Sequence, residues 1–157
     1  MVKIHKAGCQ DGQEISKLLK DKYSFSSVAE ALETFNGECT YQHYRIAEEA
    51  EKIVGLISWR PQGIFKHGVV ELSRIAVSPY VNDTLTVKEL LFDVMVAEAD
   101  YFYKQHGSKL RKIYSMIHAD NREIKDFFIN KGMLQEAVLR NHYHRGTDEL
   151  VFSLFFG

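Results

Sequence analysis

Cysteine and proline are both scarce in this chain, and it has no long apolar run. The only cysteines are Cys9 and Cys39, and the only prolines are Pro61 and Pro79. So few cysteines exclude a disulfide-rich scaffold. A membrane helix needs about 20 consecutive apolar residues, and no run approaches that length, so no membrane association is expected. Because no apolar signal segment follows Met1, we expect a cytoplasmic protein with both thiols reduced.

The motifs of several common enzyme classes are also missing. No G-x-S-x-G, G-x-x-x-x-G-K-[ST], G-x-G-x-x-G or H-E-x-x-H segment occurs, which argues against a serine hydrolase, a P-loop NTPase, a dinucleotide-binding enzyme and a zincin respectively. The net charge is −1, so no nucleic-acid partner is expected. His142 and His144 share one side of an extended segment that approaches a predicted turn at Gly146. No further ligand follows at a recognisable spacing, so we predict a surface loop and no metal site.

The composition of the chain is that of one ordinary globular domain. Hydrophobic residues make up 45% and charged residues 26% of the 157 residues, and no repeat or linker interrupts the pattern. We therefore predict a single domain over residues 1–157. Hydrophobic periodicity and turn residues predict strands over residues 2–7, 41–48, 52–59, 70–77, 110–118, 133–140 and 150–156, and helices over residues 13–21, 26–35, 86–106 and 121–131.

Residues 70–91 are the most informative stretch, because a buried strand leads through a short turn into a long amphipathic helix. The strand has apolar residues at Leu72 and Ile75 and ends at Pro79, and the helix is expected to start at Thr86. A helix N-terminus that follows a strand exposes free backbone N–H groups at the positive end of the helix dipole. The sequence therefore predicts that an anion, such as a phosphate, would bind at this junction.

The same stretch resembles the core of the GNAT superfamily of N-acyltransferases, whose pattern runs roughly L-x-x-[LI]-A-V-x-P-x-x-[RQ]-x-x-G-x-[GA]-x-x-L-L. The residues in register, without a gap, are Leu72, Ile75, Ala76, Val77, Pro79, Leu90 and Leu91. Residues 6–19, 53–59 and 113–133 resemble further segments of the family in the same order, so nearly the whole chain is covered. The resemblance implies an α/β (α+β) fold with a mixed, mostly antiparallel sheet of six or seven strands and about four helices. It also implies that the strands ending near Val77 and His118 run parallel and then splay apart.

The resemblance implies an enzyme that moves an acetyl or acyl group from acyl-CoA, here acetyl-CoA, to an amine by direct attack. Glu71 stands where some members carry the carboxylate that takes a proton from the acceptor amine. The backbone N–H groups of Ile75, Ala76 and Val77 would hold the thioester arm. The implied acceptor is an amine on a small molecule or a peptide.

The other cofactor-binding residues that the resemblance implies follow this strand. They are Asn82, Thr84, Thr86, Val87 and Lys88 around the start of the helix, and Asn121 and Phe128 further along the chain. Asn121 matches a family Asn that commonly contacts the pantetheine arm. Phe128 stands where many members have a Tyr that protonates the leaving thiolate. Phe has no proton to give, so water, Tyr114 and His118 are the alternatives for that role.

The loop before the helix departs from the family pattern because it has no glycine, the residue that lets a backbone approach pyrophosphate closely. Thr86 and Glu89 also form a T-x-x-E capping box that would satisfy the N–H groups of the helix itself, and Asp83 adds negative charge. The hydroxyls of Thr84 and Thr86 and the charge of Lys88 would counteract this. The alternative function is therefore a GNAT-like binding or regulatory protein that has lost tight CoA binding. A donor carried on an acyl-carrier protein is a third possibility.

Several residues have an ordinary structural interpretation beside the functional one. Glu71 could face solvent or pair with Arg74 instead of acting as a base. Aromatic residues in the N-terminal third could wall an acceptor pocket or pack in the core; they are Tyr23, Phe25, Phe35, Tyr41 and Tyr44. The apolar segment 151–156 could pair with a second copy in a homodimer.

Overall fold

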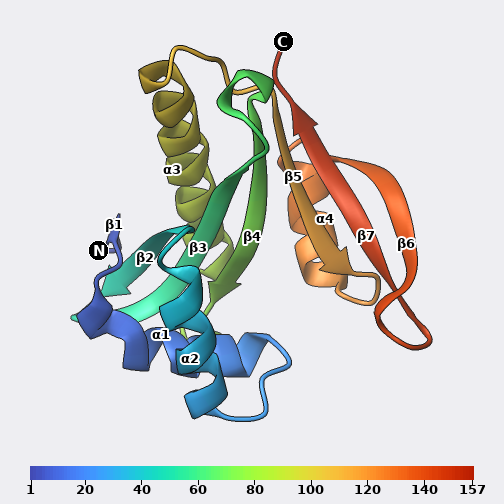
Figure 1. Cartoon of the computed structure of the whole chain (residues 1–157). Helices are drawn as coiled ribbons and strands as arrows, with labels where there is room; N and C mark the ends of the chain where they lie inside the picture. Colours follow the sequence, from blue (N-terminus) through green and yellow to red (C-terminus); the bar gives the residue numbers. More distant parts are fainter. The chain divides into compact units, whose positions relative to one another are not determined.

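The computed structural model describes residues 1–157 and contains seven strands, four α-helices and two short 3-10 helices (Figure 1). The strands are β1 (Lys3–Lys6), β2 (His43–Glu49), β3 (Lys52–Gln62), β4 (Val69–Val77), β5 (Lys112–His118), β6 (Leu134–His144) and β7 (Thr147–Phe155). The helices are η1 (Cys9–Asp11), α1 (Gly12–Lys22), α2 (Val28–Glu38), η2 (Phe65–His67), α3 (Thr84–Gln105) and α4 (Arg122–Asn130). Cys9 and Cys39 are both exposed free thiols. No helix is long and apolar enough to cross a membrane.

The strands form one sheet in the order β1-β2-β3-β4-β5-β7-β6. Strand β4 runs parallel to β5, whereas β1 with β2, β2 with β3, β5 with β7 and β6 with β7 are antiparallel. Two parallel neighbours need a crossover connection, and α3 lies between β4 and β5 in the chain. The predicted mixed, mostly antiparallel sheet and its parallel pair are therefore confirmed. The paired register of β4 and β5 runs from Val69 with Lys112 to Glu71 with Tyr114, and the divergence of the strands beyond it stays a prediction.

The residues group into two compact units, and each unit takes part of β4 and part of α3. The first unit comprises Met1–Arg60 and Arg74–Ala99, and the second comprises Pro61–Ser73 and Asp100–Gly157. The single domain over residues 1–157 stays a prediction.

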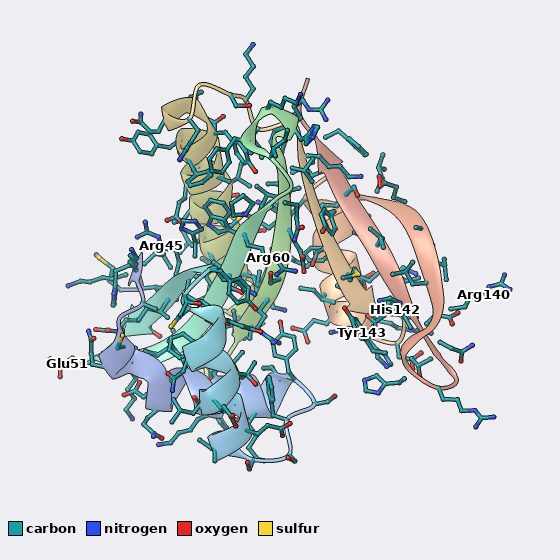
Figure 2. All side chains as sticks on the ribbon, viewed as in Figure 1. Arg45, Glu51, Arg60, Arg140, His142 and Tyr143 are labelled. Carbon is teal, nitrogen blue, oxygen red and sulfur yellow. The ribbon has the colours of Figure 1, made fainter.

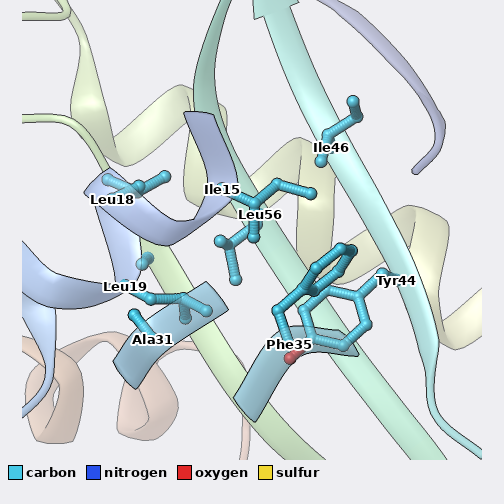
Figure 3. Close-up of a cluster of buried hydrophobic side chains, with 9 residues drawn as sticks. Ile15, Leu18, Leu19, Ala31, Phe35, Tyr44, Ile46 and Leu56 are labelled. Atoms are coloured by element: carbon cyan, nitrogen blue, oxygen red, sulfur yellow. The ribbon is translucent and has the colours of Figure 1, made fainter. Parts of the chain in front are cut away.

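The core of the first unit is built from α1, α2, β2, β3 and one residue of β4. Ile15, Leu18 and Leu19 form the buried stripe of α1, at the i, i+3, i+4 spacing of an amphipathic helix. Phe35 of α2 meets Tyr44 of β2 edge-on, with 5.0 Å between ring centroids. The buried cluster comprises Ile15, Leu18, Leu19, Ala31, Phe35, Tyr44, Ile46, Leu56 and Ala76 (Figure 3). Phe35 and Tyr44 are thus core residues, whereas Tyr23 and Phe25 are only partly buried against this cluster.

Helix α2 continues past the predicted stop at residues 36 and 37. Its N-terminus agrees with the prediction, because the Ser27 hydroxyl accepts the N–H of Glu30 at 3.1 Å. At the other end, the N–H of Cys39 donates to the carbonyl of Phe35 at 2.8 Å, so the helical bonds carry on through Gly37. The extra turn brings Glu38 to an ion pair with Arg74, a contact that local sequence does not indicate.

Helix α3 packs on β3 at the glycine of that strand. Its buried residues Val87, Leu91, Met95 and Ala99 recur every fourth position. A Cβ atom on Gly55 would lie 3.1 Å from Leu91 Cδ1 and 3.3 Å from Val87 Cγ1, so only glycine permits this approach without a shift. The helix begins two residues before the predicted start at Thr86. It ends at Gln105 and is followed by Gly107 with φ of 70°, which confirms the predicted C-terminal glycine.

The second unit packs α4 on β7 through aromatic side chains. Phe128 is fully buried, and its ring centroid lies 6.1 Å from those of Phe127 and Phe152. Strand β7 pairs with β5 on one side and β6 on the other. Up to Ser153, β7 thus has a strand partner at both edges. The pairing of residues 151–156 with a second copy, and the homodimer, stay predictions.

Strand β6 extends further than predicted, to His144 rather than to residue 140. It forms a hairpin with β7 through Gly146, whose φ of 82° suits glycine. His142 and His144 accordingly lie on a strand and not in a loop. No group of three or more His, Cys, Asp or Glu side chains is placed to hold a metal ion.

Candidate functional site

The N-terminus of α3 is capped by Asp83 and not by Thr86. The N–H of Thr86 donates to Asp83 Oδ1 at 3.0 Å, and the Thr86 hydroxyl donates to Asp83 Oδ2 at 2.6 Å. The predicted capping box of Thr86 and Glu89 is therefore wrong, because Thr86 is the third residue of the helix and acts as a donor. The Thr86 hydroxyl, its N–H and the N–H of Leu85 lower the pKa of Asp83 below its ordinary value. The carboxylate is thus ionised exactly where an anion was expected to bind.

The other predicted residues at this junction divide into a surface group and a buried group. Asn82, Thr84 and Thr86 all lie near the helix start. Asn82 and Thr86 are exposed, and Thr84 is half-buried. Val87 is 2% exposed and Lys88 is 8% exposed. The charge of Lys88 is therefore not displayed on the surface of the first turn, as the prediction assumed.

The two edges of β4 have different hydrogen-bond partners at the predicted thioester site. The N–H of Ser78 donates to the carbonyl of Val54 at 2.7 Å, so this side of the strand faces β3. Successive residues of a strand direct their backbone groups to opposite edges. Ile75 therefore presents its N–H and carbonyl at the edge away from β3.

That edge is occupied at Ile75 by the side chain of Tyr23. The N–H of Ile75 donates to the Tyr23 hydroxyl at 2.9 Å, and the same hydroxyl donates to the carbonyl of Ile75 at 3.1 Å. Burial raises the pKa of Tyr23, so the phenol keeps its proton at neutral pH. The sequence predicts Tyr23 only as a pocket-wall or core aromatic, and nothing in the sequence indicates this contact.

An ion pair holds the residues around Tyr23. Arg74 Nη2 lies 2.7 Å from Glu38 Oε1, and Arg74 Nε donates to Glu38 Oε2 at 3.1 Å. The guanidinium carbon lies 4.9 Å from the centre of the Tyr23 ring and 5.4 Å from that of Phe25, within cation–π range. Burial alone would lower the pKa of Arg74, but the hydrogen bonds and charge of Glu38 outweigh it and raise that pKa. The tyrosine hydroxyl of Tyr44 also donates to Glu38.

A second polar cluster of the first unit surrounds Glu98 of α3. Arg45 of β2, labelled in Figure 2, pairs with Glu98 of α3. Trp59 Nε1 donates to Glu98 Oε1 at 2.8 Å. His43 stacks on the Trp59 ring with 4.1 Å between centroids. Burial lowers the pKa of His43, although the nearby charge of Glu98 acts in the opposite direction. These residues join β2 and β3 to α3 on the face opposite Tyr44 and Ile46.

Glu71, the predicted base, is half-buried in the second unit and has defined partners. Gln62 Nε2 donates to Glu71 Oε2 at 2.8 Å, and the Tyr114 hydroxyl lies 3.4 Å from the same oxygen. Glu71 is also the residue at which the paired register of β4 and β5 ends, opposite Tyr114. The suggested pairing with Arg74 is wrong, because Arg74 binds Glu38. Gln62 was not anticipated, since no motif connects it with Glu71.

The two downstream residues of the predicted site have different environments. Asn121 is exposed and caps α4, where its Oδ1 accepts the N–H of Ile124 at 3.2 Å. This bond uses the carbonyl oxygen and keeps the amide N–H groups as donors. Phe128 is fully buried in the aromatic core and is not exposed to a ligand. Its assignment as a cofactor contact stays a prediction. Among the alternatives for the proton donor, the structure places Tyr114 beside Glu71.

Comparison with known proteins identifies the fold. No protein-family model matches the sequence, and no curated protein matches it significantly. Solved structures do match. Ard1 from Thermoplasma volcanium has a TM-score of 0.80 at 14% identity, with 99% of this chain and 98% of that chain covered. The ribosomal-protein-S18-alanine N-acetyltransferase from Escherichia coli has a TM-score of 0.78 at 14% identity, with 99% and 94% covered. A probable acetyltransferase of the GNAT family from Chromobacterium violaceum has a TM-score of 0.74 at 15% identity, with 98% and 87% covered.

Proposed function

We propose that this protein transfers an acyl group from acyl-CoA to an amine. The chain has the fold of the GNAT acyl-CoA N-acyltransferases, and the proposal starts from that fold. The observation that carries the proposal is the placement of Glu71. Its half-buried carboxylate is held by Gln62 and lies beside Tyr114, at the end of the paired register of the two parallel strands. A carboxylate fixed in this way can accept a proton in a defined direction.

The proposed reaction is a direct attack in which Glu71 acts as the base. The amine nitrogen of the acceptor forms a bond to the thioester carbonyl carbon and gives its proton to the Glu71 carboxylate, directly or through water. The carbon–sulfur bond then breaks, and the sulfur leaves as a thiolate that takes up a proton. Tyr114 is the protein group best placed beside Glu71 to supply that proton, with His118 and water as alternatives.

The residues that would hold acetyl-CoA fit it unequally. In the first unit, the N–H groups of Ile75 and Val77, at the edge of β4 away from β3, are the donors proposed for the thioester arm. In the second unit, the amide of Asn121 keeps N–H donors that match a pantetheine carbonyl. The start of α3 fits pyrophosphate poorly, because the Asp83 carboxylate accepts the N–H that an anion would use. A second candidate is therefore kept, a binding or regulatory protein that has lost tight CoA binding, and acetyl-CoA affinity distinguishes it from the enzyme.

The proposal names an amine as acceptor, on a small molecule or a peptide, because Glu71 needs a nucleophile that carries a proton to give. We further propose that the protein acts in the cytoplasm, without nucleic acid and without a membrane. The net charge of −1 provides no bulk attraction to nucleic acid or to an anionic membrane surface. A homodimer is compatible with this proposal.

Acetyl-CoA binding by the natural protein tests the proposal. We expect a Kd of tens of micromolar or weaker, equivalent to roughly 6 kcal/mol or less of binding free energy. Asp83→Asn keeps a side chain that caps helices but removes the negative charge. It should strengthen binding about two- to fivefold, since one charge at a helix N-terminus changes the free energy by about 0.5–1 kcal/mol.

Isothermal titration calorimetry of both proteins measures these values. Asp21→Asn, at an exposed residue of α1, is the matched control and should leave the Kd unchanged. Submicromolar binding by the natural protein would reject the loss of tight CoA binding. No binding by either protein at millimolar acetyl-CoA would reject the acyl-CoA transferase.

A further inference from the structure

One hydroxyl group satisfies both backbone polar groups of Ile75. Tyr23 follows the last residue of α1 and is tied to that helix by its own N–H, which donates to the carbonyl of Leu19 at 2.8 Å. Its side chain reaches β4, where the hydroxyl accepts from the N–H of Ile75 and donates to the carbonyl of Ile75. These residues are 52 positions apart in the chain, so the contact is a feature of the folded unit.

The hydroxyl takes the place that a neighbouring strand or an extended ligand would occupy. At the edge of β4 away from β3, Ile75 offers one donor and one acceptor, the pair that a strand neighbour or an amide-bearing arm would match. A hydroxyl can accept one hydrogen bond and donate another, so it matches both groups through one atom. Its oxygen accepts the same N–H that a thioester carbonyl oxygen would need.

The tyrosine ring is held in this position by charge and by packing. The Arg74 guanidinium lies over it, and Arg74 is in turn fixed by two hydrogen bonds to Glu38. Both side chains of this ion pair are mostly buried, with 18% exposure for Arg74 and 12% for Glu38. Tyr23 is therefore placed at Ile75 by the fold of the unit, independently of any ligand.

We propose that the Tyr23 hydroxyl is a resident competitor for the acyl carbonyl at the N–H of Ile75, so that the acyl donor binds only when Tyr23 withdraws. The inference rests on the proposed function, because it assumes that the thioester arm uses the β4 backbone. Tyr23 is then a positioning residue that lowers the affinity for acyl-CoA. Its effect is specific for the acyl group, since free CoA has no carbonyl on its sulfur.

Tyr23→Phe tests the proposal, because it removes the hydroxyl and keeps the ring beneath Arg74. Titration with acetyl-CoA and with free CoA separates the acyl contact from the rest of the ligand. Acetyl-CoA should bind about three- to tenfold more tightly to the variant, the effect of removing one competing hydrogen bond. The affinity for CoA should change by less than about twofold. Tyr101→Phe, at a tyrosine that is 65% exposed on α3, is the matched control and should change neither Kd.

Amide hydrogen exchange at Ile75 reports the contact directly. Without ligand, the Ile75 N–H should exchange faster in Tyr23→Phe than in the natural protein, and acetyl-CoA should restore its protection. In the natural protein, acetyl-CoA should shift the Ile75 amide signal in an NMR titration and CoA should not, which tests the proposal even if the variant fails to fold.

Two results overturn the proposal in distinguishable ways. If the natural protein binds acetyl-CoA but Tyr23→Phe binds it equally or less well, Tyr23 does not compete and the proposed function stands. If neither protein binds acetyl-CoA or CoA, the proposed function fails and this inference fails with it.

Discussion

Replacing Glu71 by glutamine is expected to lower the turnover of acyl transfer by about two to four orders of magnitude at neutral pH. Glutamine has nearly the same shape as glutamate, and its amide oxygen can still accept the hydrogen bonds from Gln62 and Tyr114. It cannot take a proton from the attacking amine. Steady-state kinetics with acetyl-CoA and a panel of primary amines measures the effect.

The control for this variant is Glu33→Gln, at an exposed residue of α2. It makes the same chemical change away from β4 and should keep the turnover of the natural protein. Thermal unfolding of Glu71→Gln shows whether the fold is intact. Unchanged turnover in a folded Glu71→Gln protein would remove Glu71 from the mechanism and leave deprotonation to water or to another group.

Removing the positive charge of Arg74 is expected to lower the free energy of unfolding by about 3 kcal/mol. Arg74→Met leaves the mostly buried Glu38 carboxylate without its bidentate partner, while the Tyr44 hydroxyl still donates to it. It also removes the cation–π contacts with Tyr23 and Phe25. Urea denaturation monitored by the fluorescence of Trp59 measures the loss.

Two comparisons isolate the burial of this pair. The double variant Arg74→Met with Glu38→Leu should be less destabilised than Arg74→Met alone, because no buried charge is left unpaired. Lys104→Met breaks an ion pair with Asp100 whose side chains are 65% and 45% exposed, and it should cost less than about 0.5 kcal/mol. Equal effects of Arg74→Met and Lys104→Met would show that burial does not strengthen the Arg74 pair.

The start of α3 shows why a correct element can have a wrong boundary. Asp83 and Thr86 are both good N-cap residues, so local preference does not choose between them. In the structure the cap is Asp83, whose carboxylate accepts both the N–H and the hydroxyl of Thr86. Helix α2 differs at its C-terminus. It continues past the predicted stop at Gly37 to Glu38, and Glu38 forms an ion pair with Arg74.

The sequence by itself determined the order of strands and helices, and its resemblance to the GNAT superfamily implied the fold and the parallel pair joined by α3. Hydrophobic periodicity and turn residues report on neighbours a few positions apart, and they are sufficient for elements and their succession. Only the tertiary structure decided which polar groups meet: Tyr23 with Ile75, Glu38 with Arg74, and Gln62 with Glu71. The first two of these pairs are separated by 52 and 36 positions. A hydrogen bond requires its atoms to come within about 3 Å, and over such separations only the packing of the chain sets that distance.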